Sequence, residues 1–375
     1  MSLSKRIAFV SNTSWSLFNF RIEVLKALRE DGYEIYLIAP KDEFTSILIS
    51  EGFEYEQIYI NKYGTKIWQE VKLIEQLYKI YKRIQPHLIF HYTAKPNIYG
   101  SWAAKSLHIP NILITTGLGH LFNFKNKKYF PLVKALYKRA SKASNEVWFL
   151  NQDDRNTFVN KNILKEEKSF ILPSEGINTQ YFSKEYFSKQ GEQVTEFLYA
   201  GRLLKSKGIE QYIEAARAIR KKKPTIHFNV LGFIDEENPD SIKYADLIRE
   251  HNSGSIKYLG ETSDIRPYLN HTDCLVFPSY YKEGISRILM EASALQVPII
   301  TTDNTGCKDV VTHLKSGLLI KPKSTEELIN ALEYFISLSQ GEREELGLRG
   351  RELVMEKFDM KKIISIYQDT CNRYI

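Results

Sequence analysis

Cysteine is scarce in this chain of 375 residues. Only Cys274, Cys307 and Cys371 are present, far apart, and no C-x-x-C pair occurs. This spacing argues against a disulfide framework and a cysteine-based zinc site, and it is typical of a protein in a reducing cytoplasm.

Long apolar runs and leader-like segments are also missing. The longest uncharged stretch, residues 106–124, is interrupted by Pro110, Gly117 and Gly119, so we do not expect it to span a membrane. Residues 1–6 lack the layout of a signal peptide. The first loop contains no G-x-G-x-x-G, which excludes the dinucleotide-binding fingerprint at that point.

What is present is ordinary for a globular protein: 43% hydrophobic and 26% charged residues. At about 150 residues per domain, the length predicts two domains, and the polar segment 183–193 is the expected linker.

The net charge of +7 is unevenly distributed along the chain. Residues 1–190 hold 27 Lys+Arg and 18 Asp+Glu, a net +9, and residues 191–375 hold 25 and 27, a net −2. A basic first half favours an anionic surface as partner, with plain surface variation as the alternative.

Apolar runs alternate with helical patterns along the first half. Residues 6–11 and 33–40 read as strands; between them a loop over 12–19 leads into a helix over 20–30. An amphipathic helix over 66–85 follows. This alternation predicts an α/β fold with a parallel sheet.

The most basic stretch of the chain is 120–144. It contains seven lysines and arginines and no acidic residue, and aromatic side chains are interspersed among them. Such a pattern suits an anionic membrane surface. The alternatives are a nucleic-acid surface and an ordinary core helix with a solvated basic face.

The stretch from 279 to 291 organises the second half. It follows a buried-strand pattern, 274–278, and runs into a helical pattern, 288–295. In open α/β sheets ligands bind beyond the carboxyl ends of strands, and the start of a helix favours anions. Glu283 would lie in the loop and Glu291 about two turns into the helix, each touching a different part of one extended ligand. Two solvated surface glutamates are the alternative.

A second loop, within 199–208, carries Arg202 and Lys207. Arginine offers a fork of donors and lysine a compact point charge, a combination suited to phosphate groups. Two fixed cations could neutralise a diphosphate without a metal, and no Asp-x-Asp sequence occurs in the chain.

These motifs, in this order, resemble the retaining GT-B glycosyltransferases of glycosyltransferase family 4. The resemblance rests on Glu283-Gly284-Ile285-Ser286-Arg287-Ile288-Leu289-Met290-Glu291, on the 199–208 loop, and on the segments 231–232, 258–260, 303–311 and 316–320. It implies two Rossmann-like domains facing across a cleft: residues 1–190 for the acceptor, 191–358 for the nucleotide sugar, and a helix over 359–375 that crosses back to the first domain.

The resemblance also implies roles for residues. The catalytic set is Arg202, Lys207 and Glu283. The donor-binding set adds Gly232, Tyr258, Gly284, Ile285, Ser286 and Glu291. On the acceptor side we expect Ser14, Trp15, Thr116, Gly117 and His120, although a structural role for His120 is the alternative. The candidate membrane residues are Lys125, Lys127, Lys128, Phe130, Lys134, Lys138 and Arg139.

Within that family the chain is similar to enzymes that add N-acetylgalactosamine to polyprenyl-diphosphate-linked sugars in bacterial glycan assembly. The implied partners are a UDP-sugar, which serves as co-substrate, a lipid-linked saccharide acceptor and an anionic membrane surface. We expect no nucleic acid, no metal and no other cofactor, and a peripheral location on the cytoplasmic face of the cell membrane. The alternatives are a soluble acceptor and a non-catalytic GT-B protein that binds membranes.

Overall fold

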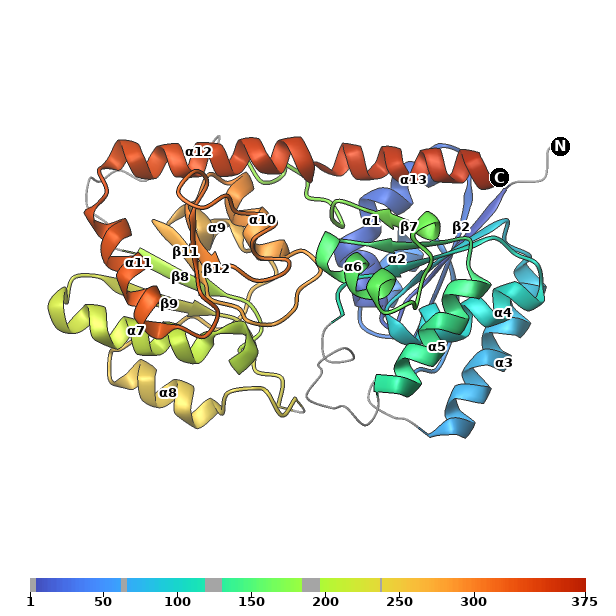
Figure 1. Ribbon diagram of the computed structural model, residues 1–375, viewed down its shortest axis with the longest axis horizontal. Coiled ribbons are helices and arrows are strands. Elements are labelled where there is room, and N and C mark those ends of the chain that lie inside the picture. The colour runs from blue at the N-terminus through green and yellow to red at the C-terminus, as the bar shows by residue number, and fades with distance from the viewer. Residues whose placement is uncertain (1–4, 62–65, 119–129, 184–195, 237) are drawn as a thin grey trace. The chain divides into compact units, whose positions relative to one another are not determined.

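The computed structural model describes residues 5–61, 66–118, 130–183, 196–236 and 238–375. The chain forms two compact units (Figure 1). The first unit comprises Met1–Gly176 together with Met360–Ile375, and the second comprises Ile177–Asp359.

The first unit is built on a parallel sheet with the strand order β3-β2-β1-β4-β5-β6-β7. Its central strands are short apolar runs buried on both faces, as expected for parallel strands covered by helices. The strands are β1 (Arg6–Val10), β2 (Glu34–Ala39), β3 (Glu54–Gln57), β4 (Leu88–Tyr92), β5 (Asn111–Thr115), β6 (Glu146–Phe149) and β7 (Ser169–Ile171). Around it lie α1 (Ser14–Glu30), α2 (Thr45–Ser50), α3 (Ile67–Ile84), the π-helical turn η1 (Pro96–Gly100), α4 (Ser101–Ser106), α5 (Phe130–Ala143), α6 (Gln152–Asn160), the short turn η3 (Glu166–Lys168) and α13 (Met360–Tyr374).

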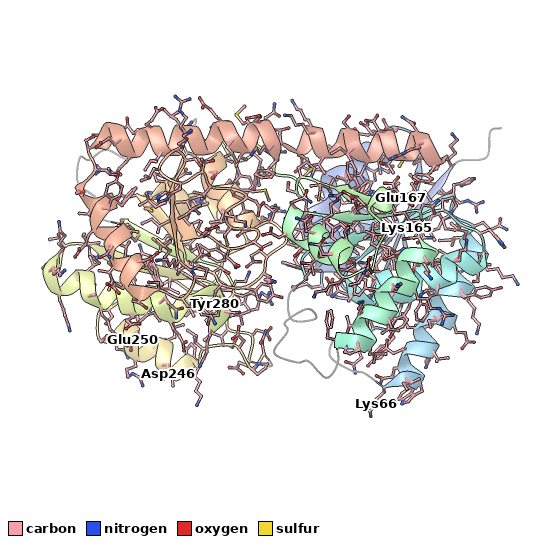
Figure 2. The ribbon with its side chains drawn as sticks, viewed as in Figure 1. Lys66, Lys165, Glu167, Asp246, Glu250 and Tyr280 are labelled. Carbon is pink, nitrogen blue, oxygen red and sulfur yellow. The ribbon has the colours of Figure 1, made fainter. Side chains whose placement is uncertain are left out.

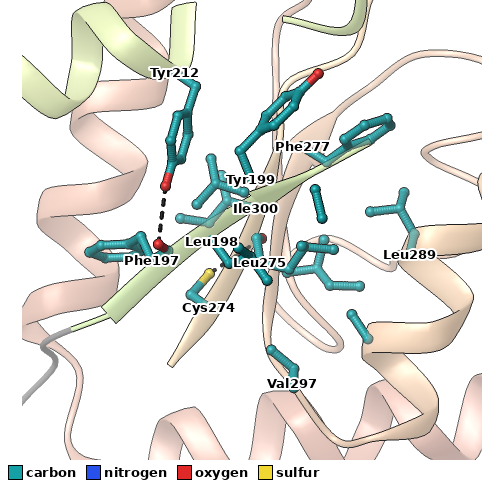
Figure 3. Packing of buried hydrophobic residues seen from close by; sticks show 14 of the residues in the cluster. Phe197, Leu198, Tyr199, Tyr212, Cys274, Leu275, Phe277, Leu289, Val297 and Ile300 are labelled. Carbon is teal, nitrogen blue, oxygen red and sulfur yellow. Dashed lines mark hydrogen bonds between the residues drawn. The ribbon is translucent and has the colours of Figure 1, made fainter. Parts of the chain in front are cut away.

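The second unit has a parallel sheet with the order β10-β9-β8-β11-β12-β13. Figure 3 shows its core, where the Tyr212 hydroxyl donates to the Phe197 carbonyl at 3.1 Å. The strands are β8 (Glu196–Ala200), β9 (His227–Leu231), β10 (Lys257–Tyr258), β11 (Cys274–Phe277), β12 (Ile299–Thr302) and β13 (Leu318–Ile320). The helices are the turn η4 (Lys205–Lys207), α7 (Ile209–Lys222), α8 (Tyr244–Asn252), α9 (Arg266–Asn270), α10 (Arg287–Ala294), α11 (Thr325–Ser337) and α12 (Gln340–Lys357).

The last helix, α13, belongs to the first unit. Its Tyr367 ring packs against Phe9, Phe90 and Trp148, and its hydroxyl lies 2.8 Å from that of Tyr92. These contacts are buried and aromatic, so they fix the end of the chain in the core of the first unit.

The boundary between the units differs from the expected position after residue 190. The backbone N–H of Ile177 donates to the Phe358 carbonyl at 3.0 Å, and Arg351 donates to the Phe182 carbonyl at 3.0 Å. Because these bonds tie residues 177–182 to the end of α12, this segment belongs to the second unit, which ends at Asp359.

The predicted loop over 12–19 is also wrong. Helix α1 begins at Ser14 instead of residue 20. Thr13 is extended, and its hydroxyl accepts the N–H of Ser16 at 3.1 Å. This N-cap satisfies one of the free donors of the first turn, so the helix starts almost directly after β1.

Candidate donor site and acceptor-side residues

Two neighbouring strands of the second unit, β8 and β11, end in the loops that carry the predicted catalytic residues. The Lys207 ammonium forms an ion pair with the Glu283 carboxylate, although 76 residues separate them. Each side chain is only 12% exposed. The Ser279 hydroxyl donates to the same carboxylate oxygen of Glu283 at 3.4 Å.

The two loops are joined through their backbones. The N–H groups of Tyr280 and Tyr281 both donate to the Ser206 carbonyl at 2.9 Å. Gly208 follows with φ +83, and a Cβ at this position would lie 2.2 Å from the Pro278 carbonyl oxygen. Glycine is required there by both the left-handed backbone and the close approach of the other loop, so Lys207 is held firmly beside Glu283.

Aromatic rings surround the Lys207 ammonium. It lies 5.2 Å from the centre of the Tyr281 ring and 5.5 Å from that of Phe277. Both distances are within the range of cation–π attraction. The rings therefore attract the ammonium and cover part of its surroundings.

Arg202, at the end of the β8 strand, differs from Lys207. Its side chain is exposed, and within the described ranges it forms no ion pair with a carboxylate. The guanidinium is therefore available for an anionic ligand, whereas Lys207 is already neutralised by Glu283.

The predicted donor residues Gly232 and Tyr258 form part of the framework. Gly232 has φ +147, and a Cβ there would meet the Gly201 carbonyl oxygen at 1.8 Å. The Tyr258 hydroxyl donates to the Gly232 carbonyl at 3.0 Å. The structure thus accounts for both residues by packing between the β8 and β9 loops.

The segment from Gly284 to Ser286 leads into α10. Ser286 is buried, its backbone N–H donates to the Gly306 carbonyl at 3.0 Å, and it is the N-cap residue of α10. Ile285 is half-buried and packs on the core of the unit. The first turn of α10 is therefore fixed next to the Glu283 loop.

Glu291 lies one turn after Arg287 on α10. The Arg287 Nε donates to the Glu291 Oε1 at 2.8 Å, and the Glu291 side chain is 13% exposed. Burial raises the pKa of the Glu291 carboxyl, while the Arg287 charge opposes that shift. Arg287 had no role in the sequence analysis; its position four residues before Glu291 was the signal that could have found it.

The acceptor-side residues of the first unit fall into different environments. Ser14 is fully buried, and its hydroxyl donates to the Pro40 carbonyl at 3.1 Å. Trp15 is about half exposed, and its ring meets Phe20 edge to face. Thr116 and Gly117 follow β5 and are partly buried, whereas His120 lies outside the described residues.

Sequence reasoning missed a polar cluster after β4. Thr93 has φ +68, which is unusual for a β-branched residue and is associated with functional sites. It precedes the π-helical turn η1, a feature also frequent at such sites. Lys95 forms a largely buried ion pair with Glu70 of α3, and the buried hydroxyl of Thr115 on β5 has no partner within the described residues. The run of polar residues directly after a buried strand was the available signal.

The predicted membrane stretch is only partly described. Lys125, Lys127 and Lys128 lie outside the described residues. On α5, Phe130 and Lys134 are half-buried, Lys138 is exposed, and the Arg139 guanidinium lies 4.7 Å from the centre of the Trp102 ring. Among the described helices, none is both long enough and apolar enough to cross a membrane.

Two parallel-sheet units, each with its polar residues at strand ends, form the GT-B architecture of glycosyltransferases. A solved structure with the same fold is the HepE protein of Anabaena in complex with UDP, with a TM-score of 0.78 and 14% identity over 98% of this chain and 100% of that one.

Comparison with protein families agrees with this class. Residues 6–151 match the family described as glycosyl transferase 4-like, and residues 183–353 match glycosyl transferases group 1. Together the two matches cover most of the chain, and both describe glycosyltransferases, so the chain is a glycosyltransferase with the GT-B fold. Glycosyl transfer is the activity that these matches establish.

Two curated relatives extend over most of the chain. One is the N,N'-diacetylbacillosaminyl-diphospho-undecaprenol alpha-1,3-N-acetylgalactosaminyltransferase of Campylobacter jejuni, 29% identical over 86% of this chain and 87% of the relative. The other is the UDP-Gal:alpha-D-GlcNAc-diphosphoundecaprenol alpha-1,3-galactosyltransferase of Escherichia coli, 25% identical over 70% of each.

Proposed function

We propose that this glycosyltransferase moves a sugar from a UDP-sugar to a polyprenyl-diphosphate-linked saccharide in bacterial glycan assembly. N-acetylgalactosamine or a related hexose is the proposed sugar, and the anomeric configuration is retained. The names of the two relatives support the lipid-linked acceptor and the UDP donor.

The observation that carries the donor half of the proposal is the arrangement of charges after β8 and β11. One cation, Arg202, is exposed, and a second, Lys207, is paired with a shielded carboxylate. When UDP leaves, negative charge grows on its β-phosphate. Preorganised cations stabilise that charge without the cost of reorganising water, and with two of them the proposed reaction needs no metal.

Glu283 has a complementary role in this proposal. A sugar hydroxyl that donates to the Glu283 carboxylate replaces part of its interaction with Lys207, and Lys207 turns to the diphosphate. The carboxylate thus orients the sugar, and the lysine stabilises the leaving group. Glu291, held by Arg287, is proposed to accept hydrogen bonds from the ribose hydroxyls. We assign no separate base. The acceptor hydroxyl instead attacks from the side of the sugar on which UDP leaves, and its proton passes to the departing phosphate oxygen.

The acceptor is proposed to bind the first unit. Trp15 offers an exposed ring on which a sugar can stack, and Thr116 and Gly117 follow the carboxyl end of β5. A lipid-linked acceptor remains in the bilayer, so the proposed location is peripheral, on the cytoplasmic face of the membrane.

The test measures UDP release from a panel of UDP-sugars with a short-chain polyprenyl-diphosphate-sugar as acceptor. We expect acceptor-dependent release with one donor, and loss of about 100-fold or more in Lys207→Ala, as for removal of a group that stabilises charge in the transition state. Glu291→Ala is expected to lose affinity for the donor.

Lys205→Ala is the matched control. Lys205 lies in the same turn, but it is half exposed and paired with Glu210 at 3.3 Å, so its removal should leave the rate unchanged. Release with sucrose-type soluble acceptors instead would reassign the acceptor. Silence with UDP-, GDP- and ADP-sugars alike would contradict the proposed donor chemistry.

A further inference from the structure

The beginning of α3 exposes three large apolar side chains in five residues. Ile67 is 80% exposed, Trp68 62% and Val71 57%. At about 100° per residue these positions lie within about 100° of one another, on one side of the helix. The rest of α3 follows the usual pattern, since Leu73, Leu77 and Ile80 are buried. The exposed residues are therefore a local exception at one end of the helix.

The inner side of the same turn is polar and well satisfied. Glu70 is 12% exposed and pairs with Lys95. Its charge is thus neutralised and directed inward, which leaves the apolar side chains as the outer surface. Adjacent exposed apolar side chains rimmed by charged residues are typical of a site that contacts another apolar phase.

A second helix begins at the same edge of the sheet. In a parallel sheet the helix after each strand starts beyond the carboxyl ends of the strands. This applies to α3, which follows β3, and to α5, which follows β5, and both helices pack on η1 and α4. Figure 1 shows the first turns of α3 and α5 on the same side of the first unit. On α5, Leu132 is 59% exposed.

The exposed charges nearest these apolar residues are basic, and Glu75, one turn after Val71, is paired with Lys79 at 2.6 Å. Lys66, labelled at the free end of α3 in Figure 2, and Lys72 are exposed on α3. Lys138 and Arg139 are exposed on α5, which contains no acidic residue. Apolar side chains, an exposed tryptophan and flanking cations are the combination that binds the interface of an anionic bilayer.

We propose that the first turn of α3 is a membrane anchor, in which Ile67, Trp68 and Val71 enter the interface of an anionic bilayer while the lysines contact lipid phosphates. Leu132 of α5 is a smaller second contact. The inference deepens the proposed function, because an enzyme with a lipid-linked acceptor must work at this interface. Its main residues, on α3, lie outside the basic stretch 120–144 predicted from the sequence, whereas Leu132 of α5 lies within that stretch.

The first experiment is co-sedimentation of the full chain with phosphatidylcholine vesicles, with and without phosphatidylglycerol, in the absence of sugars. We expect the wild type to bind the anionic vesicles. The triple variant Ile67→Ser, Trp68→Ser, Val71→Ser should bind at least about tenfold more weakly, because it loses the apolar area that would be buried.

The matched control is Ile47→Ser with Ile49→Ser on α2. These isoleucines belong to the same unit and are 40% and 52% exposed, but we assign them no contact with lipid. This variant should bind like the wild type. In addition, brominated lipids should quench the fluorescence of the wild type, and Trp68→Phe should remove most of that quenching.

Equal binding by the triple variant and the wild type, or no vesicle binding by the wild type, would overturn the anchor. A wild-type dimer that becomes monomeric in the triple variant would assign this surface to a second copy of the chain and also overturn it.

The anchor and the proposed function can fail separately. Transfer to a short-chain acceptor in detergent needs no bilayer, so the triple variant should retain it. Vesicle binding without transfer would contradict the proposed function alone, and transfer without vesicle binding would contradict the anchor alone.

Discussion

A double-mutant cycle on Lys207 and Glu283 tests whether their ion pair is coupled as the structure indicates. The variants are Lys207→Met, Glu283→Gln and the two together. Removal of one partner of a buried pair typically costs about 3–5 kcal/mol, whereas exposed pairs contribute only about 0–1 kcal/mol. Since each side chain is 12% exposed, the pair belongs near the buried limit.

We expect Lys207→Met to lower the stability of the second unit by about 2–3 kcal/mol. The value is below the buried limit because the Ser279 hydroxyl still donates to Glu283. The double variant leaves no unpaired charge, so it should be clearly more stable than the sum of the single losses predicts. A coupling of about 2 kcal/mol follows.

The assay must report the second unit alone, because an unfolding transition shared by two units is not a two-state measurement. All four tryptophans, Trp15, Trp68, Trp102 and Trp148, belong to the first unit. Hydrogen exchange of peptides from β8 and β11 therefore gives the free energy of opening, and tryptophan fluorescence serves as a control that should not change. Additive single losses, within about 0.5 kcal/mol, would refute the coupling.

Three further predictions concern the framework and the buried groups. Gly208→Ala should destabilise the second unit by at least about 2 kcal/mol more than Gly254→Ala. Both glycines have positive φ (+83 and +74), but only at Gly208 would the added Cβ lie 2.2 Å from a carbonyl oxygen. Equal losses of stability for the two variants, measured by hydrogen exchange, would contradict this. Burial lowers the pKa of His91 to about 3, whereas the unfolded chain has the ordinary value of about 6.5. Below about pH 6.5 the unfolded state therefore takes up a proton that the folded state does not, and stability falls as the pH falls. Between pH 6.5 and 5 the first unit should lose about 2 kcal/mol by fluorescence-detected urea unfolding, and His91→Gln should remove that pH dependence. Burial raises the pKa of Glu291, so ionisation of this carboxyl costs stability above that pKa, and the cost disappears as the pH falls. Glu291→Gln should therefore not lower the melting temperature at pH 8, and a lower value would count against the reasoning. The same variant should weaken UDP binding about tenfold in a thermal-shift titration.

Much of the fold could be predicted from local patterns. The strands β1, β2, β4 and β5 are buried on both faces and read as short apolar runs, and α3 and α13 are amphipathic. The sequence did not reveal α12, because Gly347 and Gly350 are poor helix formers. The structure explains Gly347: a Cβ there would lie 2.2 Å from the Gln296 carbonyl oxygen. Tertiary packing therefore outweighs helix propensity at this position.

The candidate site was predictable in its residues and not in its contacts. Motif order identified Lys207 and Glu283 separately, but their ion pair depends on β8 and β11 being neighbours in the sheet. Likewise, the loop expected around Ser14 is helical, because the Thr13 hydroxyl and the Asp42 carboxylate accept the N–H groups of Ser16 and Trp15 in its first turn. Both differences arise from interactions that a one-dimensional pattern does not contain.

The glycines in the loops after β8 and β9 have a consequence for attempts to alter the proposed sugar specificity. At Gly208 and Gly232 the backbone of one loop touches the backbone of another, so no L-amino acid with a side chain fits without moving the strands. Diversity introduced there would destabilise the second unit before it changed the donor. Libraries should instead vary a side chain that lies beside Lys207 without joining the loops, such as the ring of Tyr281. Backbone contacts therefore fix these loops, and only side chains that do not take part in those contacts can be varied without moving the strands.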